Sequence, residues 1–265
     1  VRSRPVDSIV AEAKKMAAAG HKEIVLTGVN ISCYGQDLGN NVCDAIEAVA
    51  EIEDVKRVRL GSLELDLFTD EMLVRMSKVE KFCPHFHLSL QSGSDKTLKN
   101  MNRLYDTKLY TDMMNRLREL FDKPSFTTDI IVGFPGETEE DFLETLDLVN
   151  KCKYDNAFTF IFSKREGTPA CKLDDPVSLK EKEERLQRLN EVVNKYFLEN
   201  NKKLEGKVLP VLVEGVSDKK NMYFGYSDTN KLINFESDRE IEIGSIVNVE
   251  ITSAKTWSLD GREVK

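Results

Sequence analysis

Three short segments of this chain end an apolar run in glycine, proline and polar side chains. They are His87-Leu88-Ser89-Leu90-Gln91-Ser92-Gly93 and the ranges 128–137 and 160–169, and each precedes a helical pattern. In parallel α/β folds the carboxyl ends of the strands meet at one edge, where small residues let a substrate approach the backbone. The pattern therefore predicts part of an enzyme barrel with a ligand site at successive strand ends.

The elements that would position these segments alternate between strand and helix from residue 5 to about 154. We expect strands over 23–27, 55–60, 85–90, 126–132 and 157–162, and helices over 6–19, 42–52, 71–78, 108–121 and 139–151. Thr138 with Asp141 is typical of a capping box at the last of these helices. These are roughly five βα units, fewer than the eight of a TIM barrel, so the barrel is either partial or has strands upstream of Val1.

A long amphipathic helix follows, with Ser178 and Glu181 as a second expected capping box. Beyond residue 205 the pattern changes to alternating runs, at 208–213, 231–235, 246–252 and 262–264, which predict a small five-stranded β-barrel of oligonucleotide-binding type. We therefore expect two domains, a partial (β/α) barrel with its closing helix at 1–204 and a small β-barrel at 205–265.

Composition limits the functions that this chain can have. No apolar stretch approaches the ~18 residues that span a bilayer, which predicts no membrane partner. The five cysteines are scattered without a C-x-x-C pair, which argues against a disulfide scaffold or a self-contained zinc or iron–sulfur site and favours a cytoplasmic location. A net charge of −8 discourages nucleic-acid binding in general, so an RNA substrate would need local basic patches.

The strand ends resemble those of the methylthiotransferases of the radical S-adenosylmethionine superfamily. The resemblance covers the whole chain and is most specific at Gln91-Ser92-Gly93-Ser94-Asp95, at 129–138 and at Arg165-Glu166-Gly167-Thr168-Pro169-Ala170. It implies an α/β fold in which a partial (β/α) radical-SAM barrel is followed by a small all-β TRAM barrel.

The resemblance also implies an activity, the addition of a methylthio group to C2 of the hypermodified adenosine next to the tRNA anticodon. The ranges 26–39 and 83–105 are similar to enzymes that act on N6-threonylcarbamoyladenosine, whereas 154–170, 231–236 and 254–261 are similar to the N6-isopentenyladenosine enzymes. We favour the threonylcarbamoyl substrate because the barrel half lies nearer the reacting base, and keep the isopentenyl substrate as the alternative.

One departure from the family is large. The family binds a [4Fe–4S] cluster through a C-x-x-x-C-x-x-C loop, and Val1-Arg2-Ser3-Arg4-Pro5 resembles the sequence just after that loop. We therefore interpret the chain as a fragment that is inactive alone. The complete enzyme would use S-adenosyl-L-methionine, [4Fe–4S] clusters, an electron donor and a sulfur source. A non-catalytic tRNA-binding fragment is the alternative of another class, and a phosphate-recognising (β/α) enzyme is disfavoured because no G-x-x-x-x-G-K-[ST] loop occurs.

The resemblance assigns candidate residues to both domains. For the cofactor they are Gly28, Asn30, Ser62, Glu64, Gln91, Ser92, Gly93, Asp129, Gly133, Pro135, Gly136, Ser163 and Arg165. Of these, Gly133, Pro135 and Gly136 could equally serve only to turn the chain. For the tRNA anticodon arm they are Lys207, Lys219, Lys220, Lys231 and Lys255, with Tyr223, Phe224 and Trp257 as aromatic candidates.

Simpler structural roles compete with several of these functions. We expect Trp257 to fill the small core rather than bind RNA, and we expect His85 and His87 to be packed or exposed imidazoles rather than metal ligands. The acidic runs at 137–141 and 181–184 are interpreted as solvated first turns of helices.

Overall fold

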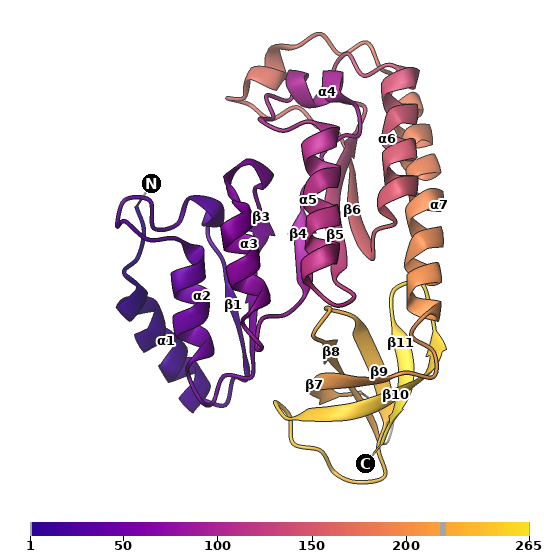
Figure 1. The fold of residues 1–265 in the computed structure, drawn as a ribbon. Helices are drawn as coiled ribbons and strands as arrows, with labels where there is room; N and C mark the ends of the chain where they lie inside the picture. Colours follow the sequence, from indigo (N-terminus) through magenta and orange to yellow (C-terminus); the bar gives the residue numbers. More distant parts are fainter. Residues whose placement is uncertain (1, 218–220, 265) are drawn as a thin grey trace.

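The computed structural model describes residues 2–217 and 221–264, and it consists of an open α/β part followed by a small β-barrel (Figure 1). No helix among these residues is both long enough and apolar enough to cross a membrane. Each part buries its own apolar cluster, one running from Ala13 to Phe197 and the other from Val211 to Leu259.

The α/β part alternates strands with helices, as expected. Its strands are β1 (Glu23–Leu26), β2 (Arg57–Leu60), β3 (Ser62–Leu63), β4 (His85–Leu88), β5 (Ser125–Val132) and β6 (Asn156–Ile161). Its helices are α1 (Val6–Ala18), α2 (Val42–Ala50), α3 (Asp70–Ser77), α4 (Asp95–Asn100), α5 (Thr107–Leu120), α6 (Glu139–Cys152) and α7 (Leu179–Lys202), with 3-10 turns η1 (Ile31–Cys33), η2 (Leu65–Leu67) and η3 (Pro169–Lys172).

Strands β2 and β3 are two parts of one path that bends at Gly61. β2 pairs with β1, and β3 pairs with β4, which continues through β5 to β6. All of these pairings are parallel, so the carboxyl ends of the strands share one edge. The five strand positions expected from the sequence are therefore present, and the predicted partial (β/α) barrel is confirmed.

The alternation along the strands separates two faces of the sheet. Phe86 and Phe126 belong to the apolar core, whereas His85, His87 and Thr127 form hydrogen bonds with one another on the opposite, inner face. A polar inner wall is therefore built into an otherwise apolar sheet.

The C-terminal part is a closed five-stranded barrel. Its strands are β7 (Val208–Val216), β8 (Met222–Ser227), β9 (Leu232–Glu236), β10 (Ile246–Ala254) and β11 (Leu259–Glu263), in the order β10-β11-β9-β8-β7. The predicted number of strands is confirmed, although β8 was not among the runs identified from the sequence. The division of domains at residue 204 stays a prediction.

The small barrel is fastened to the amino ends of the α/β strands. Arg57 donates to the carbonyl oxygens of Tyr226 (2.9 Å) and Pro210 (2.7 Å), and Arg59 donates to that of Asp228 (2.9 Å). Both arginine residues are about 5% exposed, and the Arg59 guanidinium also pairs with Glu23 at 2.7 Å. These contacts close the end of the sheet that lies opposite the carboxyl ends, so those ends stay open.

Helix α6 is tied to α7 by charged groups that we expected to be solvated. Glu137 is 4% exposed and accepts from Arg185 at 2.8 Å, and Arg185 is itself 2% exposed. Asp141 is 5% exposed and accepts from Ser94 and Lys96, both at 2.8 Å. The prediction of a solvated acidic turn at 137–141 is therefore wrong for Glu137 and Asp141, because three helices and a turn converge there, whereas Glu139 and Glu140 are exposed as expected.

The two expected capping boxes differ in outcome. Thr138 and Asp141 form the complete reciprocal box at the start of α6. At the start of α7 the Ser178 hydroxyl accepts from the Glu181 backbone, but the Glu181 carboxylate accepts from Arg185 instead of closing the box. The competing ion pair explains this difference.

Candidate active site at the carboxyl ends of the strands

The structure brings together candidates from β1 and β3. The Asn30 side chain donates to Glu64 Oε2 at 3.3 Å, and its oxygen accepts from the Cys33 backbone to cap η1. Both side chains are exposed, as are Gly28 and Ser62 beside them. This edge therefore offers an amide, a carboxylate and open backbone to a ligand.

Asp129 lies on the inner face and is held there by two side chains from β4 and its extension. Its Oδ2 atom is 3.2 Å from His87 Nε2 and accepts from Ser89 Oγ at 3.0 Å. The hydrogen bond from His87 lowers the pKa of Asp129 despite partial burial, so the carboxylate is charged at neutral pH. Its side chain is 30% exposed, which leaves it accessible from the open interior.

Sequence reasoning missed His87 and Ser89 as partners of Asp129. Their alternate spacing on one strand was the available signal. Phe158 and Phe160, on β6, were also missed; they are 51% and 50% exposed, and the Phe158 ring centre lies 6.1 Å from that of His87. The inner wall thus combines one fixed carboxylate with exposed aromatic surface.

Gln91, Ser92 and Gly93 are placed differently from one another. The Gln91 N–H donates to the Asp129 carbonyl oxygen of β5, and the Gln91 carbonyl oxygen accepts from the N–H of Ile131 in the same strand. The φ of Gln91, 66°, lies in the left-handed region, so this residue shapes the end of β4. Ser92 is fully buried beside Thr145. A Cβ atom on Gly93 would lie 2.5 Å from the Thr145 backbone. The small residues at 92 and 93 therefore let α6 approach, which supports the packing role, and their role in cofactor binding stays a prediction.

The glycine-proline turn after β5 serves the fold. Gly133 is buried with φ of 70°, and its N–H donates to Glu137 at 2.9 Å. A Cβ atom there would collide with the Lys182 side chain, and Pro135 is buried too. Gly136 is exposed with φ of 84°. The structure therefore supports a packing role for this turn more than a role in ligand approach.

Ser163 and Arg165 follow β6 and are both exposed. Within the described part of the chain, no ion pair or side-chain hydrogen bond occupies the Arg165 guanidinium. It lies at the carboxyl edge with a planar set of donors, which suits a carboxylate or phosphate.

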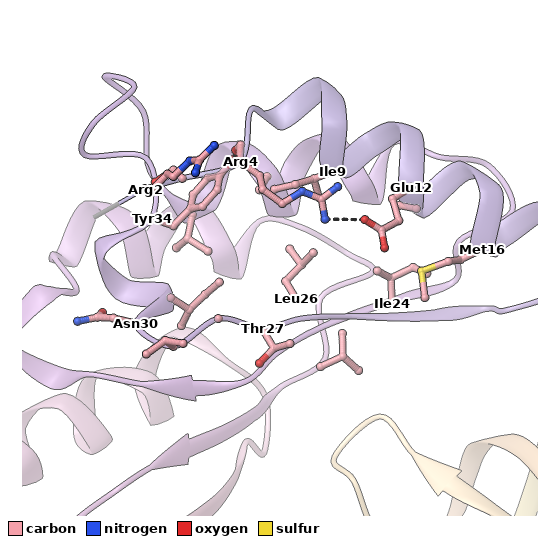
Figure 2. Close-up of a pocket in the computed structure, with 18 residues that line it drawn as sticks. Arg2, Arg4, Ile9, Glu12, Met16, Ile24, Leu26, Thr27, Asn30 and Tyr34 are labelled. Carbon is pink, nitrogen blue, oxygen red and sulfur yellow. Dashed lines mark hydrogen bonds and ion pairs between the residues drawn. The ribbon is translucent and has the colours of Figure 1, made fainter.

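A cavity of about 630 Å³ runs along β1 beneath α1 (Figure 2). Ile9 and Met16 line it from α1, and the segment from Ile24 to Ile31 lines the opposite wall, which includes Gly28 and Asn30. Arg4, paired with Glu12, lies at its rim. Ser62, Glu64, Gln91 and Asp129 do not line this cavity, so the cofactor candidates are divided between the β1 cavity and the inner wall.

The five cysteines do not suit an iron–sulfur cluster. Cys43, Cys83 and Cys152 are buried in separate elements, and burial raises the pKa of Cys43 to about 11 and that of Cys83 to about 12. Across residues 2–217 and 221–264 no three His, Cys, Asp or Glu side chains are grouped so that they could hold a metal ion. The residues present therefore do not fit a cluster.

The RNA candidates of the small barrel are also divided. Lys231 is 11% exposed and its ammonium group pairs with Asp155 at 2.8 Å between the domains, and its RNA contact stays a prediction. Lys207 is exposed, and Lys255 is 60% exposed while pairing with Asp260. Lys219 and Lys220 lie outside the described residues.

The burial of the aromatic candidates differs from what the sequence predicts. Tyr223 is buried against Phe235, whereas Trp257 is 71% exposed. The prediction that Trp257 fills the core is therefore wrong, because ten other residues already fill the barrel interior.

Comparison with protein families agrees with this arrangement. Residues 1–149 match the radical SAM superfamily model, and residues 202–264 match the TRAM domain model. The chain belongs to the radical SAM superfamily. Membership implies S-adenosylmethionine and an iron–sulfur cluster as the cofactors of this superfamily.

Within this superfamily, the chain is similar to curated proteins that share one name. The chain is 45% identical over 266 residues to the tRNA-2-methylthio-N(6)-dimethylallyladenosine synthase of Clostridium tetani, covering 99% of this chain and 58% of that protein. It is 44% identical to the Acetivibrio thermocellus protein of the same name, covering 100% of this chain and 55% of that protein. The chain thus spans less than three fifths of the length of these relatives.

Among solved structures, methylornithine synthase (PylB) matches with a TM-score of 0.50 at 18% identity, over 71% of this chain and 53% of that one. At this identity the match supports the fold alone. The names of the curated relatives agree with the isopentenyl alternative rather than with the threonylcarbamoyl substrate that we favoured from sequence.

Proposed function

We propose that this chain is the barrel and TRAM portion of a tRNA methylthiotransferase that acts on N6-dimethylallyladenosine. The identity of 45% over nearly the whole chain to a synthase of that product carries the proposal. The open carboxyl edge, with an accessible charged carboxylate and exposed aromatic rings, supports it as a place where a cofactor and a base could meet.

The residues of the edge fit S-adenosylmethionine by their chemistry. Its ammonium group needs anionic acceptors and its ribose needs both acceptors and donors, which Glu64, Asp129 and Asn30 supply. When bound and reduced, this cofactor supplies a carbon radical that can remove a hydrogen atom from a substrate. The protein's own contribution is to orient the cofactor, and His87 and Ser89 hold the Asp129 carboxylate in place for that purpose.

The chain alone is proposed to be inactive. The cysteines that it contains do not form a cluster site, so no electron source for the cofactor is provided by the described residues. By itself the chain would bind RNA without modifying it. Anaerobic reconstitution with iron and sulfide tests this, because absorption of a bound [4Fe–4S] cluster in the purified chain would contradict it.

Nucleoside mass spectrometry tests the activity. The complete coding sequence is expressed in cells that lack adenosine methylthiolation, and their tRNA is digested. We expect 2-methylthio-N6-dimethylallyladenosine to accumulate. The threonylcarbamoyl product in its place would restore the other substrate, and neither product would refute the proposal. Asp129→Asn should abolish the product at equal protein abundance, whereas Asp147→Asn, at an exposed position on α6, should not.

A further inference from the structure

We propose that the exposed indole of Trp257, which lies beside a shallow crevice of about 50 Å³, binds one unpaired base of the RNA substrate by stacking. The inference rests on the proposed function, because it takes tRNA as the substrate, and it adds where and how a second base is held. Trp257 is the only tryptophan of the chain and lies in the turn between β10 and β11.

The turn that carries Trp257 is held rigidly. Asn201, on α7, donates from Nδ2 to the carbonyl oxygens of Lys255 (2.8 Å) and Thr256 (3.1 Å). The Lys255 N–H donates to the Ser258 carbonyl at 2.8 Å across the turn. The indole is nevertheless 71% exposed. An indole held in place by its turn loses little conformational entropy when a planar partner covers it, which favours stacking there.

The crevice beside the indole belongs to both domains. Asp155 and Asn156 line it from the start of β6, Asn230 and Lys231 line it from the turn between β8 and β9, and Ser258 lines it beside Trp257. Asp155 and Lys231 neutralise each other at 2.8 Å, so the wall presents amides and a hydroxyl without net charge. A neutral polar wall next to an exposed ring suits a planar base with hydrogen-bonding edges better than a phosphate or an apolar peptide.

The distance between the crevice and the open edge indicates how long a ligand must be to reach both. It lies at the amino end of β6, whereas the open edge lies at the carboxyl end of that six-residue strand. Six residues of strand span about 20 Å. A base stacked on Trp257 is therefore several nucleotides away from a base at the open edge, so a folded RNA can occupy both places at once and a free nucleoside cannot.

Tryptophan fluorescence tests this directly, because Trp257 is the sole indole. A tRNA anticodon stem-loop is titrated into the chain, with intrinsic fluorescence and the anisotropy of labelled RNA measured in parallel. We expect saturable quenching with the same midpoint as the anisotropy change. Trp257→Leu should weaken RNA binding about ten-fold, Trp257→Phe should restore most of it, and free adenosine should not compete.

Ile243→Ala is the matched control, since Ile243 is a 57% exposed apolar residue of the small barrel outside the crevice. It should leave the affinity unchanged. If RNA binds without quenching and Trp257→Leu binds as tightly as wild type, the stacking site is refuted while tRNA binding stands. If no variant and no wild-type protein binds the stem-loop, the RNA-binding part of the proposed function fails, and the stacking site fails with it.

Discussion

Replacing His85 with Asn should remove about 2 kcal/mol of the loss of folding stability between pH 7 and pH 5. His85 is 8% exposed on the inner face, and its Nε2 atom lies 3.2 Å from Thr127 Oγ1. Burial, together with the smaller effects of the charges on Arg59, His87 and Lys231, lowers its pKa to about 3. The imidazole is therefore neutral in the folded protein, whereas the unfolded chain takes up a proton near pH 6.5.

The direction and size of this pH effect on the unfolding free energy follow from the difference in proton binding between the folded and unfolded states. The unfolded state binds more protons than the folded state between pH 6.5 and 3, so stability falls as the pH falls through that window. Between pH 7 and pH 5 the loss from this one group is about 2 kcal/mol. Below about pH 3 the folded protein also binds the proton, so the loss becomes constant.

Urea unfolding followed by far-ultraviolet circular dichroism at pH 7 and pH 5 measures the effect. The difference in unfolding free energy should be smaller in His85→Asn than in wild type by about 2 kcal/mol. Thr127→Val is the control: it removes the hydroxyl but keeps the imidazole buried, so it should lower stability at both pH values by about 1 kcal/mol and leave the difference intact. Equal differences in wild type and His85→Asn would refute a buried neutral imidazole.

Three further predictions concern a close packing contact, a buried ion pair and the attachment of the two domains. Gly93→Ala should destabilise the protein by about 1–3 kcal/mol in thermal unfolding, because the new Cβ meets the backbone of α6. Gly136→Ala is its control: the new Cβ meets no atom within 4 Å, so only the positive φ should cost stability, by about 1 kcal/mol. Arg185→Met should cost about 3–5 kcal/mol, and adding Glu137→Met should recover much of it in the same assay. Arg59→Met should speed proteolytic separation of the two domains at unchanged secondary structure; an unchanged cleavage rate would show that the arginine does not fasten them.

The sequence predicted the fold well because the βα units are local. Apolar runs of strand length, each followed by a helical period, define parallel units without knowledge of distant contacts. It missed α4, which has six residues, and β8, where polar and aromatic residues hide the alternation. It also placed Glu137 and Asp141 in solvent, because the partners that bury them come from separate elements.

Strand ends were harder to assign, since glycine and serine serve packing and ligand approach equally well. Gly93 and Gly28 look alike in sequence, yet one receives a helix backbone and the other lines an open cavity. Asn30 and Glu64 could be placed near each other only through the pairing of their strands. His87 became recognisable as a partner of Asp129 once the register of β4 against β5 was known.

The contact between the domains could not have been read from side-chain types at all. Arg57 and Arg59 donate to backbone carbonyls about 150 to 170 positions away, and a carbonyl is available at any residue. These bonds close the amino ends of the strands and bury Lys231, a residue that composition alone would assign to RNA. The same attachment brings Trp257 beside the start of β6, so the proposed stacking site depends on two arginines of the other domain.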